Sequence, residues 1–233
     1  MRRTTLTDLA NNPDLISGIY NYCDRWCERC PLTSRCLVYA TEQEDNDSPQ
    51  NRDLRNEAFW RKLTAIFQET RELIVAWAVA AGVELNGTSD DDDSRPKRKR
   101  QLVDNHPLTK AGKKYANAAT DWFREFDQTV EVSDSEDARE VIQWYQYQIA
   151  VKTMRALSGR NEELDEDPKD SDGSAKVALI GIDRSIAAWR MMQLSLPDRV
   201  ESIVPLMLQL ERLRQRVEKS FPQARYFIRP GFD

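Results

Sequence analysis

Residues 203–217, IVPLMLQLERLRQRV, decide the fold class of this chain. Apolar side chains recur there every three or four positions, as they do on the buried face of an α-helix. They are Ile203, Leu206, Met207, Leu210, Leu213 and Val217. A half-buried strand would alternate apolar and polar residues instead, and no stretch of the sequence sustains that alternation. The spacing predicts a helix over about residues 198–219.

The same periodicity predicts four more helices upstream, over about residues 52–84, 108–130, 136–158 and 175–194. Residues 86–106 and 159–173 separate some of them and are polar, highly charged and poor in apolar anchors. We expect these two segments to be partly disordered surface loops. The sequence therefore predicts an all-α protein, a helical bundle of about five long helices.

Composition indicates a globular protein with a substantial core, because 40% of the 233 residues are hydrophobic and 31% are charged. The N-terminus, MRRTTLTDLANNPD, lacks the apolar run of a secretory signal, and the apolar stretch 73–83 is too short to span a bilayer. We therefore expect a cytoplasmic protein without a membrane segment.

All four cysteines, Cys23, Cys27, Cys30 and Cys36, fall within 14 residues. Tight cysteine spacing in a reducing compartment is typical of metal or redox chemistry, and it leaves two disulfides as the alternative. We predict that residues 1–48 form a metal-binding segment and that residues 49–233 form the helical bundle.

Helical phase suggests how these thiolates could meet. At 100° per residue, Cys23, Cys27 and Cys30 lie within an arc of about 60° on one helix face. Pro31 should interrupt that helix, since proline lacks the amide hydrogen and clashes with the preceding turn. A second short helix, with Pro31 at its first position, would bring Cys36 back toward the other thiolates. We expect a helix-turn-helix that encloses a four-thiolate site.

The spacing favours an iron–sulfur cluster over zinc. Structural zinc sites commonly use two separated Cys-x-x-Cys pairs, whereas this segment has one, Cys27 and Cys30. A [4Fe–4S] cluster needs one cysteine for each corner, and short mixed spacings can supply them. Zinc remains the alternative metal, and a non-cysteine ligand such as Asp24 is not favoured because it should point away from the cysteine face.

The stretch 27–40, CERCPLTSRCLVYA, resembles the cysteine core of WhiB-like proteins, which carry a Cys-x2-Cys-Pro-x4-Cys-Leu pattern. The resemblance implies an oxygen- and nitric-oxide-sensitive [4Fe–4S] cluster ligated by Cys27, Cys30 and Cys36, in a redox-responsive transcription regulator. In that family the first cysteine lies much further upstream than Cys23 does here. The Gly-Val-Trp-Gly-Gly turn that follows the family's cluster is absent from this chain.

Other catalytic or metal chemistry finds little support in the sequence. The single histidine, His106, precludes the paired Glu-x-x-His motifs of di-iron bundles and any Ser/His/Asp or Cys/His set. No catalytic residue is predicted, and whether the protein is an enzyme stays open.

The net charge of −5 hides one basic segment. Residues 95–114 contain eight Lys or Arg and a single acid, Asp104, so they carry a local charge of +7. Aspartates 90–93 precede this segment and would partly neutralise it, which favours a solvated linker over nucleic-acid binding.

We expect an iron–sulfur protein that transfers electrons to an unidentified partner protein or senses redox state. The alternatives are a zinc-stapled helical interaction protein and a cluster-dependent regulator that binds nucleic acid through residues 95–114.

Overall fold

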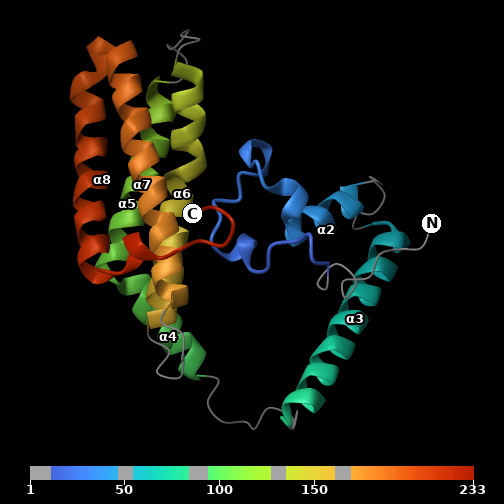
Figure 1. The fold of residues 1–233 in the computed structure, drawn as a ribbon. Helices are drawn as coiled ribbons and strands as arrows, with labels where there is room; N and C mark the ends of the chain where they lie inside the picture. The colour runs from blue at the N-terminus through green and yellow to red at the C-terminus, as the bar shows by residue number, and fades with distance from the viewer. Residues whose placement is uncertain (1–11, 47–54, 84–93, 127–134, 161–168) are drawn as a thin grey trace. The chain divides into compact units, whose positions relative to one another are not determined.

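The computed structural model describes residues 12–46, 55–83, 94–126, 135–160 and 169–233. Every regular element in these ranges is an α-helix or a 3₁₀-helix, which confirms the predicted all-α class (Figure 1). The chain divides into two compact units. The first contains residues 1–20 and 27–93, and the second contains residues 21–26 and 94–233. This division differs from the predicted boundary between residues 48 and 49.

Four long helices form the bundle of the second unit: α5 (Pro107–Phe126), α6 (Glu136–Arg160), α7 (Lys169–Ser195) and α8 (Val200–Ser220). Consecutive helices run in opposite directions (Figure 1), and α6 and α7 share the most extensive interface. Four of the five predicted helices are thus found in the bundle. The loop predicted over residues 159–173 is wrong at both ends, because α6 continues to Arg160 and α7 begins at Lys169, and residues 161–168 of that prediction lie outside the described residues. Asp170 and Asp172 in the first turn of α7 suit the positive end of its helix dipole.

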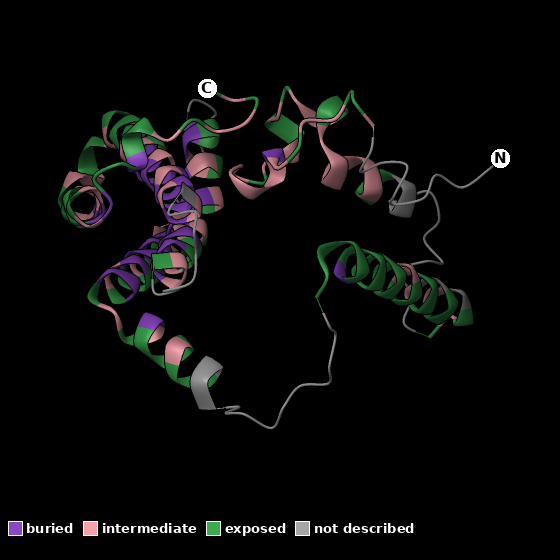
Figure 2. Cartoon of the chain, turned by 60° about the horizontal axis from the view of Figure 1, so that its bottom comes forward, coloured by how far each residue is buried: buried purple, intermediate pink, exposed green. Residues whose placement is uncertain are grey.

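Large side chains build the core of the bundle. Figure 2 marks in purple the buried residues along these helices. Trp189 of α7 is completely buried, and its indole nitrogen Nε1 donates a hydrogen bond of 2.9 Å to the hydroxyl oxygen of Tyr115. Trp122 packs edge-on against Trp189 with ring centroids 5.1 Å apart. The buried indole nitrogen of Trp189 therefore has an acceptor, and the core avoids the free-energy cost of an unsatisfied hydrogen-bond donor.

Helix α4 (Ser94–Asn105) corrects the predicted surface loop over residues 86–106 where the structure describes it, and residues 86–93 of that prediction lie outside the described residues. It packs against α5 and α6, and Val103 is its buried anchor, with 4% of its surface exposed. The amide of His106 donates to the carbonyl of Val103, and the amide of Lys110 donates to the carbonyl of His106, so α4 passes into α5 through hydrogen-bonded turns. Lys, Arg and Gln are good helix formers, which favours a helix over this segment.

The first unit contains two α-helices among its described residues, α2 (Leu37–Asn46) and α3 (Glu57–Ala81). The prediction of a helix over residues 52–84 is confirmed, but α3 belongs to this unit rather than to the bundle. Its large apolar side chains are mostly exposed, including Trp60 at 53% and Trp77 at 62%. The helix ends at Ala81; Gly82 follows it with a positive φ of 65°, which suits glycine, and the amide of Val83 donates back to the carbonyl of Ala78.

No helix within the described ranges combines the length and the apolar character needed to cross a membrane.

Candidate metal centre and its anchor

The division into two units separates the cysteines: Cys23 belongs to the second unit, and Cys27, Cys30 and Cys36 belong to the first. All four side chains are half-buried, and none of them forms a disulfide in this structure. Each group is described below within its own unit.

The helix predicted to carry Cys23, Cys27 and Cys30 on one face is not formed. A 3₁₀-helix ends at Asn21, and the next turn, Cys27–Arg29, is also a short 3₁₀-helix. Between them the amide of Trp26 donates to Oδ1 of Asp24 at 3.2 Å, and Arg25 adopts a positive φ of 59°. Such a local bond from an aspartate side chain competes with helical hydrogen bonding, and the left-handed residue ends any helical path.

The predicted interruption at Pro31 is confirmed. The amide of Cys30 donates to the carbonyl of Cys27 at 3.2 Å and closes the first turn. The chain then forms a second 3₁₀-helix, Thr33–Arg35, and enters α2 at Leu37. Pro31 does not occupy the first position of that second helix, as had been expected, because the helix begins two residues later.

Local bonds within the first unit hold the segment that carries these three cysteines. The amide of Ile16 donates to the carbonyl of Arg35 at 3.0 Å, and the guanidinium Nε of Arg35 donates to the carbonyl of Asp14 at 3.2 Å. The amide of Leu32 points at Sγ of Cys30, 3.4 Å away. Amide-to-sulfur hydrogen bonds of this kind stabilise a thiolate, and they tune the potential of thiolate-bound clusters.

No three His, Cys, Asp or Glu side chains within the described ranges gather closely enough to hold a metal ion. The thiols of Cys27, Cys30 and Cys36 are thus of the right type and sequence spacing for a cluster, without being assembled around one point. Metal sites often form only when the metal binds, because the free ligands are not held together in its absence.

The segment around Cys23 is held against the bundle by Asp24. Oδ2 of Asp24 accepts hydrogen bonds from the hydroxyl of Tyr145, at 2.5 Å, and from Nη1 of Arg184, at 2.8 Å. The backbone carbonyl of Asp24 accepts two more, from Nε1 of Trp144 at 2.9 Å and from Nε2 of Gln148. Asp24 is therefore bound by three residues of α6 and by one arginine of α7.

The hydroxyl of Tyr145 also accepts a hydrogen bond from Arg184. Burial raises the pKa of Tyr145 above its ordinary value, and its hydrogen bond to the carboxylate of Asp24 adds to that increase. Tyr145 is therefore a neutral hydroxyl that can donate its hydrogen bond throughout the physiological pH range.

Aromatic contacts reinforce this anchor. The ring of Trp26 stacks on that of Trp144 with centroids 5.0 Å apart, and it meets the edge of Tyr145. Tyr22 donates to Oδ1 of Asp170 at 3.0 Å. A Cβ atom added at Gly173 of α7 would collide with the ring of Tyr22, so the glycine allows this close approach.

Lys152 of α6 lies beside Cys23. It is 8% exposed, and its ammonium donates to the backbone carbonyl of Asn21 at 3.4 Å. Burial lowers the pKa of Lys152 and raises the pKa of the Cys23 thiol, while the attraction between the two groups partly offsets both shifts. A positive charge at this position favours a thiolate at Cys23, because opposite charges stabilise each other's ionised form.

Sequence reasoning missed the role of Asp24. It placed Asp24 away from the cysteine face of a helix that is not formed, and it gave no partner for the Asp24 carboxylate. The partners Tyr145 and Arg184 lie more than 120 residues away, and no motif links them to the cysteines. The one local signal was the cluster of three hydrogen-bonding side chains on α6, Trp144, Tyr145 and Gln148, which could bind a neighbouring polar loop.

The sequence matches no protein-family model, no curated protein and no solved structure. The resemblance of residues 27–40 to WhiB-like proteins therefore stays a prediction from the cysteine pattern alone.

Proposed function

We propose that Cys23, Cys27, Cys30 and Cys36 ligate a [4Fe–4S] cluster, and that the protein acts in the cytoplasm in electron transfer or redox sensing. The observation that carries this proposal is that all the cysteines of the chain lie within 14 residues as half-buried side chains outside any disulfide. Four thiolates are the donor set that such a cluster uses, and the cluster would supply a one-electron redox couple when bound.

The surroundings of two cysteines support the proposal. Sγ of Cys30 already has an amide donor in Leu32. Cys23 follows a backbone carbonyl that binds the ammonium of Lys152, so a positive charge stands near its thiol. Donors and positive charges near cluster thiolates stabilise the reduced state and raise the reduction potential.

The protein's own residues supply positioning and shielding. Asp24 fixes the chain immediately after Cys23, and Trp26 stacked on Trp144 covers this part of the bundle. Residues 21–26 are fixed to the bundle, and residues 27–36 are held by local turns. The cysteines therefore lose little chain entropy when they bind a metal.

Anaerobic purification of the full-length chain tests the proposal. The protein should be brown, with broad absorption near ~400 nm that bleaches on reduction with dithionite and returns on oxidation. Helicity measured by circular dichroism should be retained through that cycle, as electron transfer or sensing requires. The Cys30→Ser variant should lose the absorption, while Ser34→Ala, in the same turn region, should keep it. A colourless protein with one equivalent of zinc would support the zinc-stapled interaction protein and contradict the proposal.

A further inference from the structure

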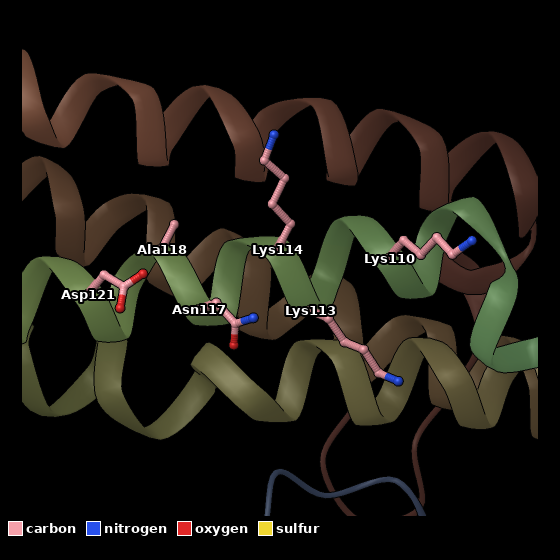
Figure 3. Close-up of a pocket in the computed structure, with 6 residues that line it drawn as sticks. All are labelled: Lys110, Lys113, Lys114, Asn117, Ala118 and Asp121. Atoms are coloured by element: carbon pink, nitrogen blue, oxygen red, sulfur yellow. The ribbon is translucent and has the colours of Figure 1, made fainter.

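One end of the bundle carries lysine and arginine side chains from two neighbouring helices. An open surface depression of about 490 Å³ on α5 is lined by Asn117, by Ala118, by Asp121, whose carboxylate pairs with Arg124, and by the three lysines Lys110, Lys113 and Lys114; Figure 3 shows the lysine side chains extending from the helix. They belong to the basic segment 95–114, which was expected to be a flexible linker. The structure places that segment in α4 and the first turns of α5, so its charges are held on a fixed surface.

Helix α8 brings more positive charge to the same end. Nε1 of Trp122 donates to the hydroxyl of Ser202 at 2.9 Å, and the guanidinium of Arg199 lies over the ring of Phe126. The C-terminal end of α5 therefore meets the N-terminal end of α8, and the two helices are antiparallel. At 1.5 Å per residue along both axes, Lys114 lies at roughly the level of Leu210, and Lys110 lies at roughly that of Arg214.

Two exposed arginines of α8, Arg212 and Arg216, fall at this level. The buried residues Leu210, Leu213 and Val217 occupy the opposite face of α8, so both arginines point to solvent. We name the four residues Lys110, Lys114, Arg212 and Arg216 the basic ridge.

The charges of the basic ridge are not neutralised within the described part of the chain. The acid nearest on the α4 side, Asp104, binds Lys113 at 3.0 Å. On α8, Glu211 binds Arg214 at 2.7 Å. No described carboxylate forms an ion pair with any of the four ridge residues, although the whole chain has a net charge of −5. An uncompensated positive surface on an acidic protein attracts a polyanion.

We propose that the basic ridge binds the phosphodiester backbone of a nucleic-acid duplex. Lysine and arginine at roughly regular spacing on a helical surface suit a row of phosphates, and arginine can donate two parallel hydrogen bonds to each. Leu208 is the only large apolar side chain of α5 or α8 that is exposed in the described structure, which gives a membrane no adequate anchor. The ridge also offers no aromatic ring for stacking on unpaired bases, which favours a duplex over a single strand, and contacts to phosphates alone make binding independent of sequence.

The proposal is tested with the full-length protein and a fluorescent DNA duplex of arbitrary sequence, with binding followed by anisotropy over a series of salt concentrations. The affinity should fall linearly with salt on logarithmic axes. The double variant Lys114→Gln/Arg216→Gln should reduce that slope by about two, one for each lost phosphate contact, for every duplex sequence tried. A second double variant, Lys110→Gln/Arg212→Gln, should do the same.

The matched control is Arg155→Gln/Arg190→Gln, which removes the same charge from exposed positions on α6 and α7, outside the basic ridge. It should leave the slope unchanged, and circular dichroism should show native helicity in all three variants. Absence of duplex binding at low salt would overturn the proposal. An equal loss of affinity in ridge and control variants, or binding to vesicles of anionic lipid without binding to the duplex, would also overturn it.

Discussion

The two parts of the cysteine segment are held in different ways. Residues 21–26 are fixed to the bundle by side chains from α6 and α7, through the carboxylate and carbonyl of Asp24 and the stacked ring of Trp26. Residues 27–36 are held by turn hydrogen bonds and by Arg35, which binds residues earlier in the same unit. Four cysteines that look equivalent in the sequence thus differ in how firmly their backbone is placed.

The two units show the same contrast in their helices. α3 has 25 residues and α7 has 27, and both are rich in apolar side chains. Trp77 of α3 is 62% exposed, whereas Trp189 of α7 is completely buried. Apolar periodicity therefore predicts that a helix forms, but it does not predict which surface that helix packs against.

The largest expected effect on stability comes from replacing the buried tryptophan, and the exposed tryptophan serves as its comparison. Trp189→Ala should lower the free energy of unfolding by about 3–5 kcal/mol, because it leaves a cavity in the core and removes the donor to Tyr115. Trp77→Ala should change it by less than about 0.5 kcal/mol, since the ring is mostly in solvent. Urea unfolding followed by circular dichroism measures both, and equal losses would refute the contrast.

Asp24→Ala should cost about 2 kcal/mol. The substitution leaves the buried hydroxyl of Tyr145 and the guanidinium of Arg184 without their common acceptor. The same change at Asp14, whose side chain is exposed in the first unit, is the matched control and should cost less than about 0.5 kcal/mol. If both variants unfold at the urea concentration of the wild type, Asp24 is not an anchor.

Gly173→Ala should cost about 1 kcal/mol despite the better helix propensity of alanine. The new Cβ would collide with the ring of Tyr22 and lie 2.8 Å from Cζ of Phe227, so one of the two rings must move. Gly159→Ala is the control, since its closest neighbour is the hydroxyl of Ser171, which can rotate away. Thermal unfolding should show a lower midpoint for the first variant only, and a higher midpoint for Gly173→Ala would argue against the close packing.

The smallest effect concerns the C-terminal residues. Oδ2 of Asp233 accepts from the ammonium of Lys176 at 2.6 Å, and Oδ1 accepts from Arg229 at 3.0 Å. The hydrogen bonds from Arg229, with those from Lys176, hold the pKa of Asp233 well below its usual range. Asp233→Asn should therefore cost about 1 kcal/mol or less near neutral pH.

The contribution of Asp233 to stability should depend on pH in one direction. A carboxyl whose pKa is lowered by folding stabilises the protein above its unfolded pKa of about 3.9, and it loses that contribution as the pH falls below this value. The stability difference between wild type and Asp233→Asn should thus be constant from about pH 7 to about pH 5 and shrink at about pH 3 and below. A difference that grows as the solution is acidified would contradict this account.

Much of the fold could be predicted because it depends on local patterns. The three- and four-residue spacing of residues such as Leu206, Leu210 and Leu213 identified α8, and the same rule found α3, α5, α6 and most of α7. α4 was missed because a single buried residue, Val103, anchors a segment that composition alone describes as a charged loop.

The cysteine segment shows where local reasoning stops. The break at Pro31 follows from covalent geometry and was predicted. The helix through Cys23 and Cys27 was not formed, because Asp24 makes a local turn and bonds to Tyr145 and Arg184, which no periodicity in residues 19–30 could reveal. Long-range side-chain partners decided the backbone there.

The central claim is that four thiolates hold a [4Fe–4S] cluster, and iron and acid-labile sulfide analysis of anaerobically purified protein tests it most directly. The account predicts about four irons and about four sulfides per chain, with little zinc, and a loss of both when Cys23 or Cys27 is changed to serine. One zinc per chain without sulfide, or a full complement of iron and sulfide in the Cys→Ser variants, would contradict it.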